Sequence, residues 1–145
     1  MAAGCTLAEA NFTTFDSALR QVASEWLDPA TLSRTLLSDG PLGIEHFNPQ
    51  TVRSLEAQVW GQAFEAPVFV DEVEVVSQRL VGEKHLKLAL RFAGEGRGTA
   101  LRDAIWFGRI EPVGERVRLA WRLGRDAYNG IERVQMIVVA IEPVA

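Results

Sequence analysis

Cysteine and histidine are scarce in this chain of 145 residues. Cys5 is the only cysteine, so no internal disulfide can form, as is usual for proteins of a reducing compartment. The two histidines, His46 and His85, lie far from each other and from Cys5 in the sequence. Because a metal site needs several such ligands together, the sequence predicts no metal-ligand cluster.

Long apolar runs are also missing. No stretch approaches the roughly eighteen apolar residues of a membrane-spanning helix, and the first residues lack the basic and then apolar pattern of a secretory signal. Yet 48% of the residues are hydrophobic, which is enough for a packed core. We therefore expect a cytoplasmic protein with one domain, or a small domain with an appendage, and no membrane partner.

An excess of positive charge is absent as well, since the net charge is −4. Residues 1–70 hold 3 basic and 8 acidic residues, whereas residues 71–145 hold 12 basic and 11 acidic ones. Ten of those twelve are arginines, which suit phosphate contacts and base stacking. The charge excludes indiscriminate nucleic-acid binding but leaves room for a local basic surface in the second half.

The first 59 residues combine helical and extended patterns. Asn11 is a candidate N-cap of a helix to about Trp26, because apolar residues recur there at helical spacing. Residues 31–37 have the alternation of a short strand. Asn48-Pro49 is expected to begin a second helix that ends near Val59. This order is typical of part of an α+β domain.

The second half alternates with period two, the signal of half-buried strands. Five strands are predicted, at residues 69–81, 85–92, 101–110, 116–125 and 131–141. The pair Val75-Val76 interrupts the first alternation and indicates a bulge. Gly82 can adopt a positive φ in the turn of the first hairpin. Trp121 shares a face with three aliphatic residues and is predicted to be buried.

Five antiparallel strands without helical crossovers favour a small closed barrel. The OB-fold is the leading form, and an SH3-like barrel is the alternative. Many OB-folds have a helix between strands three and four, but only residues 111–115 are available for it, so we expect none or a single turn. The predicted fold class is an α+β remnant followed by an all-β, five-stranded antiparallel OB-fold barrel.

Catalytic constellations are missing from the sequence. There is no Ser with a nearby His and acid, and no HExxH motif. The turn Gly94–Gly98 precedes no helix and no GK[ST] motif, so it is not a phosphate-binding loop. A lone Asp103 is more typical of an ion pair or turn. We predict no catalytic residue and no cofactor in this chain.

Basic and aromatic residues gather near two predicted turns that flank one groove in an OB-fold. Cations can neutralise phosphates there, and aromatic rings can stack on bases. The predicted single-strand-binding residues are Arg79, Lys84, His85, Lys87, Tyr128, Asn129, Arg133 and Gln135. An ordinary solvated face explains the same alternation. Arg116, Arg118 and Arg122 form either a second basic row or another solvated face.

Several segments resemble one bacterial family. The stretch QRLVGEKHLKLAL at residues 78–90 strongly resembles the C-terminal segment of RecJ exonucleases, and WGQAF at residues 60–64, followed by Pro67 and Phe69, resembles the link that precedes it. Tyr128-Asn129-Gly130 and Val134-Gln135 resemble its last hairpin. Ala2-Ala3-Gly4 resembles the end of the GGHxxAAG motif of the DHHA1 subdomain. The resemblance covers essentially the whole chain.

This resemblance implies a domain division and a function. Residues 1–59 would be the C-terminal part of a DHHA1-like subdomain, residues 60–68 a linker and residues 69–145 the OB domain. The chain would bind single-stranded DNA as part of a 5′→3′ single-strand-specific exonuclease acting in DNA repair and recombination. The implied catalytic DHH core, with Mn²⁺ or Mg²⁺, would precede Met1 in the same polypeptide. Other DNA-repair proteins are implied as further partners.

A rival hypothesis belongs to another class. The chain would then be an interaction module that docks the catalytic core or a protein partner and touches no DNA. The dependence of binding on salt separates the two hypotheses, because contacts with phosphates weaken steeply as ionic strength rises.

Overall fold

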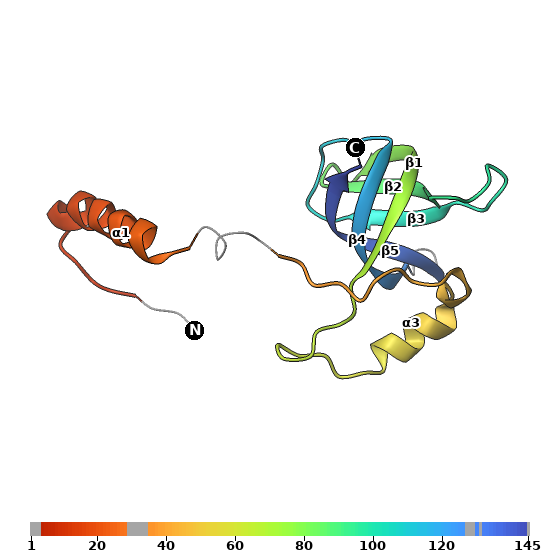
Figure 1. Cartoon of the computed structure of the whole chain (residues 1–145), viewed down its shortest axis with the longest axis horizontal. Helices are drawn as coiled ribbons and strands as arrows, with labels where there is room; N and C mark the ends of the chain where they lie inside the picture. Colours follow the sequence, from red (N-terminus) through yellow and green to blue (C-terminus); the bar gives the residue numbers. More distant parts are fainter. Residues whose placement is uncertain (1–3, 29–34, 127–129, 131, 145) are drawn as a thin grey trace. The chain divides into compact units, whose positions relative to one another are not determined.

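Two units make up the chain, Met1–Leu36 and Leu37–Ala145, and the computed structural model describes residues 4–28, 35–126, 130 and 132–144. In the first unit, helix α1 (Phe12–Trp26) follows a 3-10 turn, η1 (Glu9–Asn11; Figure 1). The predicted helix is confirmed. Asn11 occupies the N-cap position as predicted, but its side chain forms no capping hydrogen bond within the described residues.

One face of α1 is apolar and exposed. It consists of Phe12, Phe15, Leu19, Val22 and Trp26. No residue of this fully described helix is buried, and an isolated helix of this length is marginal in water. The face is therefore suited to packing against a partner. Neither α1 nor any other helix of the described residues is long and apolar enough to cross a membrane.

The strand predicted at residues 31–37 is absent from the described part of that range. Residues 31–34 lie outside the described residues, and residues 35–37 have no regular structure. Immediately afterwards the chain bonds to the segment that leads into the barrel. The Asp39 N–H donates to the Val68 carbonyl at 2.8 Å, and the Val68 N–H donates to the Asp39 carboxylate at 2.9 Å.

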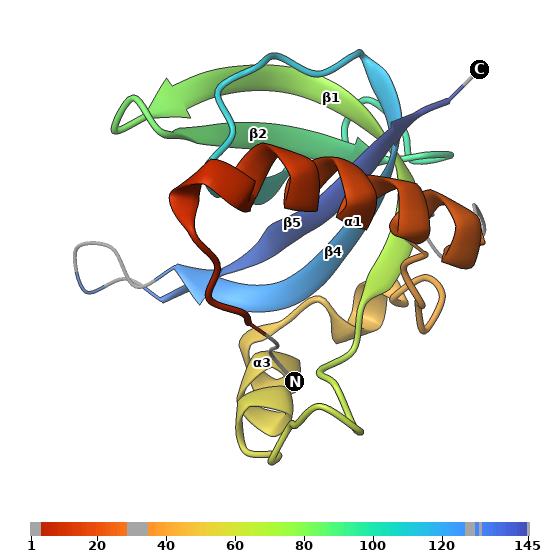
Figure 2. The ribbon, with the colours of Figure 1, turned by 90° about the vertical axis from the view of Figure 1, so that its left-hand side faces the viewer.

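Helix α3 spans Pro49–Glu56 and follows a 3-10 turn, η2 (Ile44–His46). The predicted cap is confirmed, since the Asn48 side chain accepts the Thr51 N–H at 2.9 Å. The helix ends three residues before the predicted Val59. Its Val52 is buried in the core of the barrel, and Figure 2 shows α3 beneath β4 and β5. Residues 37–56 therefore fold with the barrel as one unit.

The described residues of the second half form a closed five-stranded barrel, in the order β1-β2-β3-β5-β4 (Figure 2). The strands are β1 (Phe69–Val81), β2 (His85–Phe92), β3 (Arg102–Trp106), β4 (Arg116–Asp126) and β5 (Arg133–Pro143). The predicted bounds of the first two strands are confirmed. The third strand is shorter than predicted, because a turn with positive φ at Gly108 follows it.

Two features let the sheet curl into a barrel. The register of β1 with β2 shifts between Val75 and Ser77, which confirms the predicted bulge. Before the bulge β1 pairs with both β2 and β4, so it contributes to both sides of the closure. β3 and β5 then close the barrel through a parallel pairing, whereas the other pairs are antiparallel as predicted.

The core confirms the predicted inward face of β4. Trp121 is 0% exposed and packs among aliphatic residues from every strand. Its indole N–H donates to the Asp71 carboxylate at 2.8 Å, so the buried polar atom is satisfied. Burial raises the pKa of Asp71 above the ordinary value of 3.8, while hydrogen bonds to Trp121 and the Leu42 backbone oppose that rise.

The connection between β3 and β4 contains no helix in residues 107–115, all of which are described. This agrees with the prediction that the usual helix is absent or a single turn. A side chain fixes the loop instead. The Gln78 amide donates to the Val113 carbonyl at 3.0 Å and accepts the Val113 N–H at 2.8 Å. The loop is thereby tied to β1 by a pair of hydrogen bonds.

Candidate nucleic-acid interface

Four of the predicted site residues, Arg79, Lys84, His85 and Lys87, lie in the first hairpin. Val81 and His85 are partners at the end of the ladder, and Gly82 and Glu83 both have a φ of 59° in the turn between them. Lys84 follows at the tip and is exposed. On β1, Arg79 lies opposite Lys87 and is also exposed.

A single row of side chains crosses the outer surface of all five strands of the barrel. The register pairs Arg79 with Lys87, Lys87 with Ile105, Ile105 with Ile137, and Ile137 with Arg122. Paired residues in a sheet project from the same face. We call this set the cross-strand row. It has a guanidinium at each end and two aliphatic residues in the middle.

The two end residues of the cross-strand row are available to a ligand. Arg79 and Arg122 are exposed, and neither forms an ion pair with another described residue. Sequence reasoning missed Ile105 and Ile137 as members of the face. The alternation of Asp103, Ile105 and Phe107 was the signal that could have revealed the β3 part of it.

Lys87 is held more tightly than its neighbours. Its ammonium lies 3.6 Å from a carboxylate oxygen of Asp103 and 3.6 Å from one of Asp126, and its side chain is only 21% exposed. Asp126 ends β4, on the far side of β3 and β5 in the strand order. Lys87 of β2 therefore links β3 and β4 on the outer face, and the two carboxylates offset its charge.

His85 is fixed against the loop after β3. Its Nδ1 accepts the Gly108 N–H at 3.1 Å, so a neutral His85 carries its proton on Nε2. Its ring meets the Phe107 ring edge-on, with centroids 5.1 Å apart and planes at 77°. Phe107 is 54% exposed. The structure thus adds an aromatic ring to the predicted face beside His85.

The second predicted loop is covered only in part. Tyr128 and Asn129 lie outside the described residues. Arg133 begins β5 opposite Asp126 and is exposed. Gln135 is buried, and its amide donates to the Arg125 carbonyl at 3.4 Å. Gln135 therefore bonds across the β4–β5 ladder and offers little surface to a ligand.

The three arginines predicted as a row on the fourth strand separate. Arg118 pairs with Glu72 at 3.2 Å and with Glu142 at 4.0 Å, and Arg116 lies opposite Glu74. Arg122 lies beyond the last residue of β4 that pairs with β1, and it belongs to the cross-strand row. Arg116 and Arg118 thus face the acidic first half of β1.

Two further arginines are used inside the fold. Arg91 donates to the Glu74 carboxylate at 2.8 Å, and Arg102 forms a two-bonded pair with Glu95 at 2.9 Å. Both are buried, and buried guanidinium groups need such partners. They are structural cations and do not contribute to a surface for DNA.

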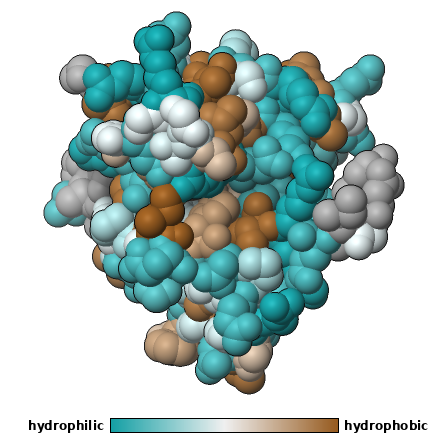
Figure 3. All heavy atoms as spheres, turned by 90° about the vertical axis from the view of Figure 1, so that its right-hand side faces the viewer, coloured by the Kyte–Doolittle hydropathy of each residue, from teal (hydrophilic) through white to brown (hydrophobic). Residues whose placement is uncertain are grey.

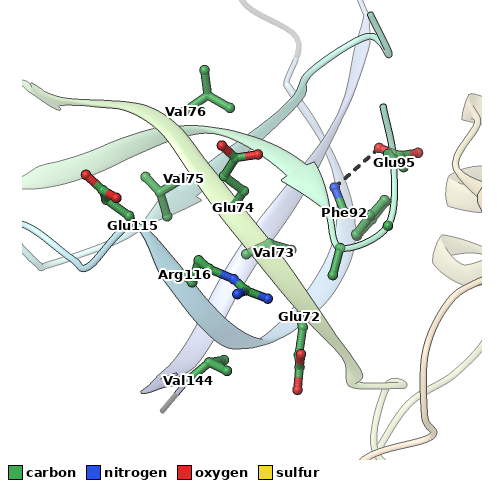
Figure 4. A pocket seen from close by; sticks show the side chains of 12 residues that line it. Glu72, Val73, Glu74, Val75, Val76, Phe92, Glu95, Glu115, Arg116 and Val144 are labelled. Atoms are coloured by element: carbon green, nitrogen blue, oxygen red, sulfur yellow. Dashed lines mark hydrogen bonds between the residues drawn. The ribbon is translucent and has the colours of Figure 1, made fainter. Parts of the chain in front are cut away.

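A cavity of about 550 Å³ lies beside the bulge of β1. Figure 4 shows Glu72 and Glu74 of β1, Glu115 and Arg116 at the start of β4, and Glu95 after β2 around it. This acidic lining would repel phosphates, and three of its carboxylates already pair with arginines. We exclude the cavity as a site for nucleic acid.

Exposed apolar atoms alone do not mark a site on this molecule. Figure 3 shows one face on which apolar residues lie among hydrophilic ones, as on most protein surfaces. In the described residues, no group of three or more His, Cys, Asp and Glu side chains could hold a metal ion. The cross-strand row differs from the other exposed apolar residues because an arginine lies at each end of its aliphatic centre.

Comparison with known proteins identifies the family of the chain. A family model described as the RecJ OB domain matches residues 38–140. The curated single-stranded-DNA-specific exonuclease RecJ of Salmonella typhimurium is 37% identical over 99% of this chain, and that of Escherichia coli is 35% identical over 99%. The chain spans about a quarter of the length of these relatives, 25% and 26% respectively.

Solved structures agree on the fold. RecJ of Thermus thermophilus in complex with Mn²⁺ matches 97% of this chain and 20% of its own length, with a TM-score of 0.71 and 23% identity. The same protein in complex with Mg²⁺ gives a TM-score of 0.70 over 97% of this chain and 21% of its own. The closed barrel is thus an OB-fold, and the chain belongs to the RecJ OB-domain family.

Proposed function

We propose that this chain is the single-stranded-DNA-binding C-terminal region of a RecJ-like 5′→3′ single-strand-specific exonuclease. The observation that carries the proposal is the cross-strand row, in which Arg79 and Arg122 flank Ile105 and Ile137 on one face. The relatives named as exonucleases specific for single-stranded DNA support the choice of ligand.

The row matches the chemistry of an unpaired strand. The phosphates of single-stranded DNA attract the guanidinium groups of Arg79 and Arg122, and its base faces can lie against the aliphatic side chains between them. Duplex DNA hides its base faces in the stack, so an apolar centre favours the single strand. Lys84 and Arg133 add exposed cations at the two hairpins.

Hydrolysis is assigned to a catalytic core that is not among these 145 residues. In such a core, a bound Mn²⁺ or Mg²⁺ would activate water and offset charge on the phosphate. The relatives of Thermus thermophilus were solved with these ions. The role of the present chain is to hold and orient the strand. We propose a cytoplasmic enzyme with single-stranded DNA, its own catalytic core and other DNA-repair proteins as partners.

A second function, docking, is favoured by α1. The exposed apolar face of this helix suits packing on the rest of a DHHA1-like subdomain in the same polypeptide. The division into residues 1–59 from that subdomain, residues 60–68 as a linker and residues 69–145 as the OB domain stays a prediction. Residues 37–56 fold as one unit with the barrel, and the match to the RecJ OB domain begins at residue 38, so α1 is the part that we assign to the subdomain. Docking through α1 and DNA binding through the barrel use different surfaces, so the two functions are compatible.

The salt dependence of binding tests the proposal. Binding of a fluorescein-labelled dT oligonucleotide to the chain is followed by anisotropy across a series of NaCl concentrations. Arg79→Ala with Arg122→Ala should weaken binding and flatten the slope of log affinity against log salt by up to about 1.4, since each phosphate contact with a single strand contributes roughly 0.7.

The matched control is Arg116→Ala with Arg118→Ala, which removes two other arginines from the outer side of β4. This variant should keep the slope nearly unchanged, because its arginines face Glu72 and Glu74. Equal losses in both double variants would show that only the net charge matters. Unchanged binding after loss of Arg79 and Arg122 would move the groove elsewhere and favour docking alone.

A further inference from the structure

Phe107 is an exposed aromatic residue next to the cross-strand row. It follows β3 and lies two residues beyond Ile105, and its contact with His85 places it on the same outer face. His85 in turn lies two residues before Lys87 on β2. The aliphatic centre of the row is thereby extended by an aromatic ring in the direction of the first hairpin.

The position of Phe107 is fixed by two contacts. The His85 ring meets it edge-on at a centroid distance of 5.1 Å, and the adjacent Gly108 N–H donates to His85 Nδ1 at 3.1 Å. Gly108 has a φ of 70°, so the backbone turns sharply after Phe107. The ring is both 54% exposed and held in place. Exposure with restraint reduces the entropy lost when a flat ligand binds.

Another exposed phenylalanine provides a contrast. Phe64 is 68% exposed, but it stacks on Trp60 with ring centroids 5.2 Å apart and planes at 27°. Phe64 therefore already has a stacking partner in the protein. Phe107 meets its neighbour edge-on, which leaves ring surface accessible for a planar group.

We infer that Phe107 is a stacking platform for one unpaired base of a bound strand, and that His85 is the positioning residue that holds it. The inference rests on the proposed function. Stacking accepts any base, because every base has a π-face, and the cations of the row are placed to hold the flanking phosphates. The ligand class is an unpaired nucleotide with intact phosphates on either side.

The test separates the base from the phosphates. The chain is titrated with dT10 and with a ten-unit abasic strand of the same phosphate number. Phe107→Ala should weaken binding of dT10 by roughly five- to 150-fold, the range measured for loss of one stacked base. It should leave binding of the abasic strand and the salt slope unchanged. Phe107→Trp should restore binding of dT10.

A second readout follows the ring itself. In NMR spectra, a thymine methyl group stacked on Phe107 should shift upfield, and the shift should vanish in Phe107→Ala. In His85→Ala the shift should decrease, which a purely structural role of His85 in the barrel would not cause. Phe64→Ala is the matched control and should behave like the unmodified chain with both strands.

Three outcomes would overturn the inference. Equal weakening of dT10 and abasic binding in Phe107→Ala would show a role in folding, and no weakening of either would show that bases do not reach the ring. If the unmodified chain bound neither strand, the proposed function would fail and this inference with it. In the first two cases, DNA binding by the barrel would stand.

Discussion

The inner and outer faces of the barrel differ most clearly along two neighbouring rows of the same strands. The inner row joins Leu88, Ala104, Met136 and Leu123 by register, and all four are buried. One residue away on each strand, the outer row consists of Arg79, Lys87, Ile105, Ile137 and Arg122. Both rows belong to the same hydrogen-bonded strands, and they differ only in the face of the sheet toward which their side chains point.

The contrast supports the proposal that the outer row is the ligand-binding surface. On β2, β3, β5 and β4 the inner row is apolar and suits the core of any barrel, whereas the exposed Gln78 continues it on β1. The outer row mixes cations with aliphatic residues, an arrangement that folding does not require. The arginines of the outer surface also have two different roles. Arg118 forms an ion pair with Glu72, whereas Arg122 forms no ion pair with another described residue. Counting arginines would not distinguish these roles.

The largest effect should come from breaking the inner face. Trp121→Ala removes the largest fully buried side chain and should lower the free energy of unfolding by about 3–5 kcal/mol. The adjacent Arg122→Ala is the control and should change it by no more than about 0.5 kcal/mol. Urea unfolding monitored by circular dichroism measures both. Similar stabilities of the two variants would refute the assignment of inner and outer faces.

Loss of the two ion pairs of Lys87 should have a smaller effect, which is on the affinity for single-stranded DNA. Asp103→Asn with Asp126→Asn removes both carboxylates that lie 3.6 Å from its ammonium. Affinity for single-stranded dT should rise by about 1 kcal/mol, roughly fivefold, because partly exposed ion pairs are worth about that much. The salt slope should also become steeper. The same pair combined with Lys87→Ala is the control, and a similar gain there would attribute the effect to net charge.

The smallest effect should appear as a pH dependence of stability. Burial raises the pKa of Asp71, so the folded state binds a proton more readily than the unfolded state does. The stability that comes from this difference is complete below the ordinary value of 3.8 and is lost as pH rises through the raised pKa.

Asp71→Asn cannot ionise, and its side-chain carbonyl can still accept the Trp121 N–H. The variant should gain stability relative to the original chain as pH rises across this window. Urea unfolding between about pH 3 and pH 7 measures the difference. A difference that does not vary with pH would contradict the assignment to the Asp71 carboxyl.

Local patterns were sufficient to predict the first hairpin. The alternation in residues 69–92 and the positive φ available at Gly82 define both strands without reference to the rest of the chain. The short connection between β3 and β4 also limited any helix there to a single turn at most. These features depend on neighbours in sequence, which is why a single sequence reveals them.

Contacts between distant segments were not predictable in the same way. The ion pair of Lys87 with Asp126 depends on closure of the barrel, and the separation of Arg122 from Arg118 depends on where β1 stops pairing with β4. The packing of Val52 on the barrel likewise joins segments that no local pattern connects. The site residues themselves stay predictions, with Tyr128 and Asn129 outside the described residues.

The loop tied by Gln78 has a consequence for protein engineering. His85 anchors its start at Gly108, and Gln78 anchors its end at Val113. Exchange of residues 109–112 between these anchors for a foreign sequence would remove the contact of the Arg109 guanidinium with the Trp106 ring and the exposed ion pair of Arg109 with Glu111. A fluorophore attached there would lie between two anchored positions, close in sequence to Phe107, and would provide an optical signal for testing the proposed binding of single-stranded DNA.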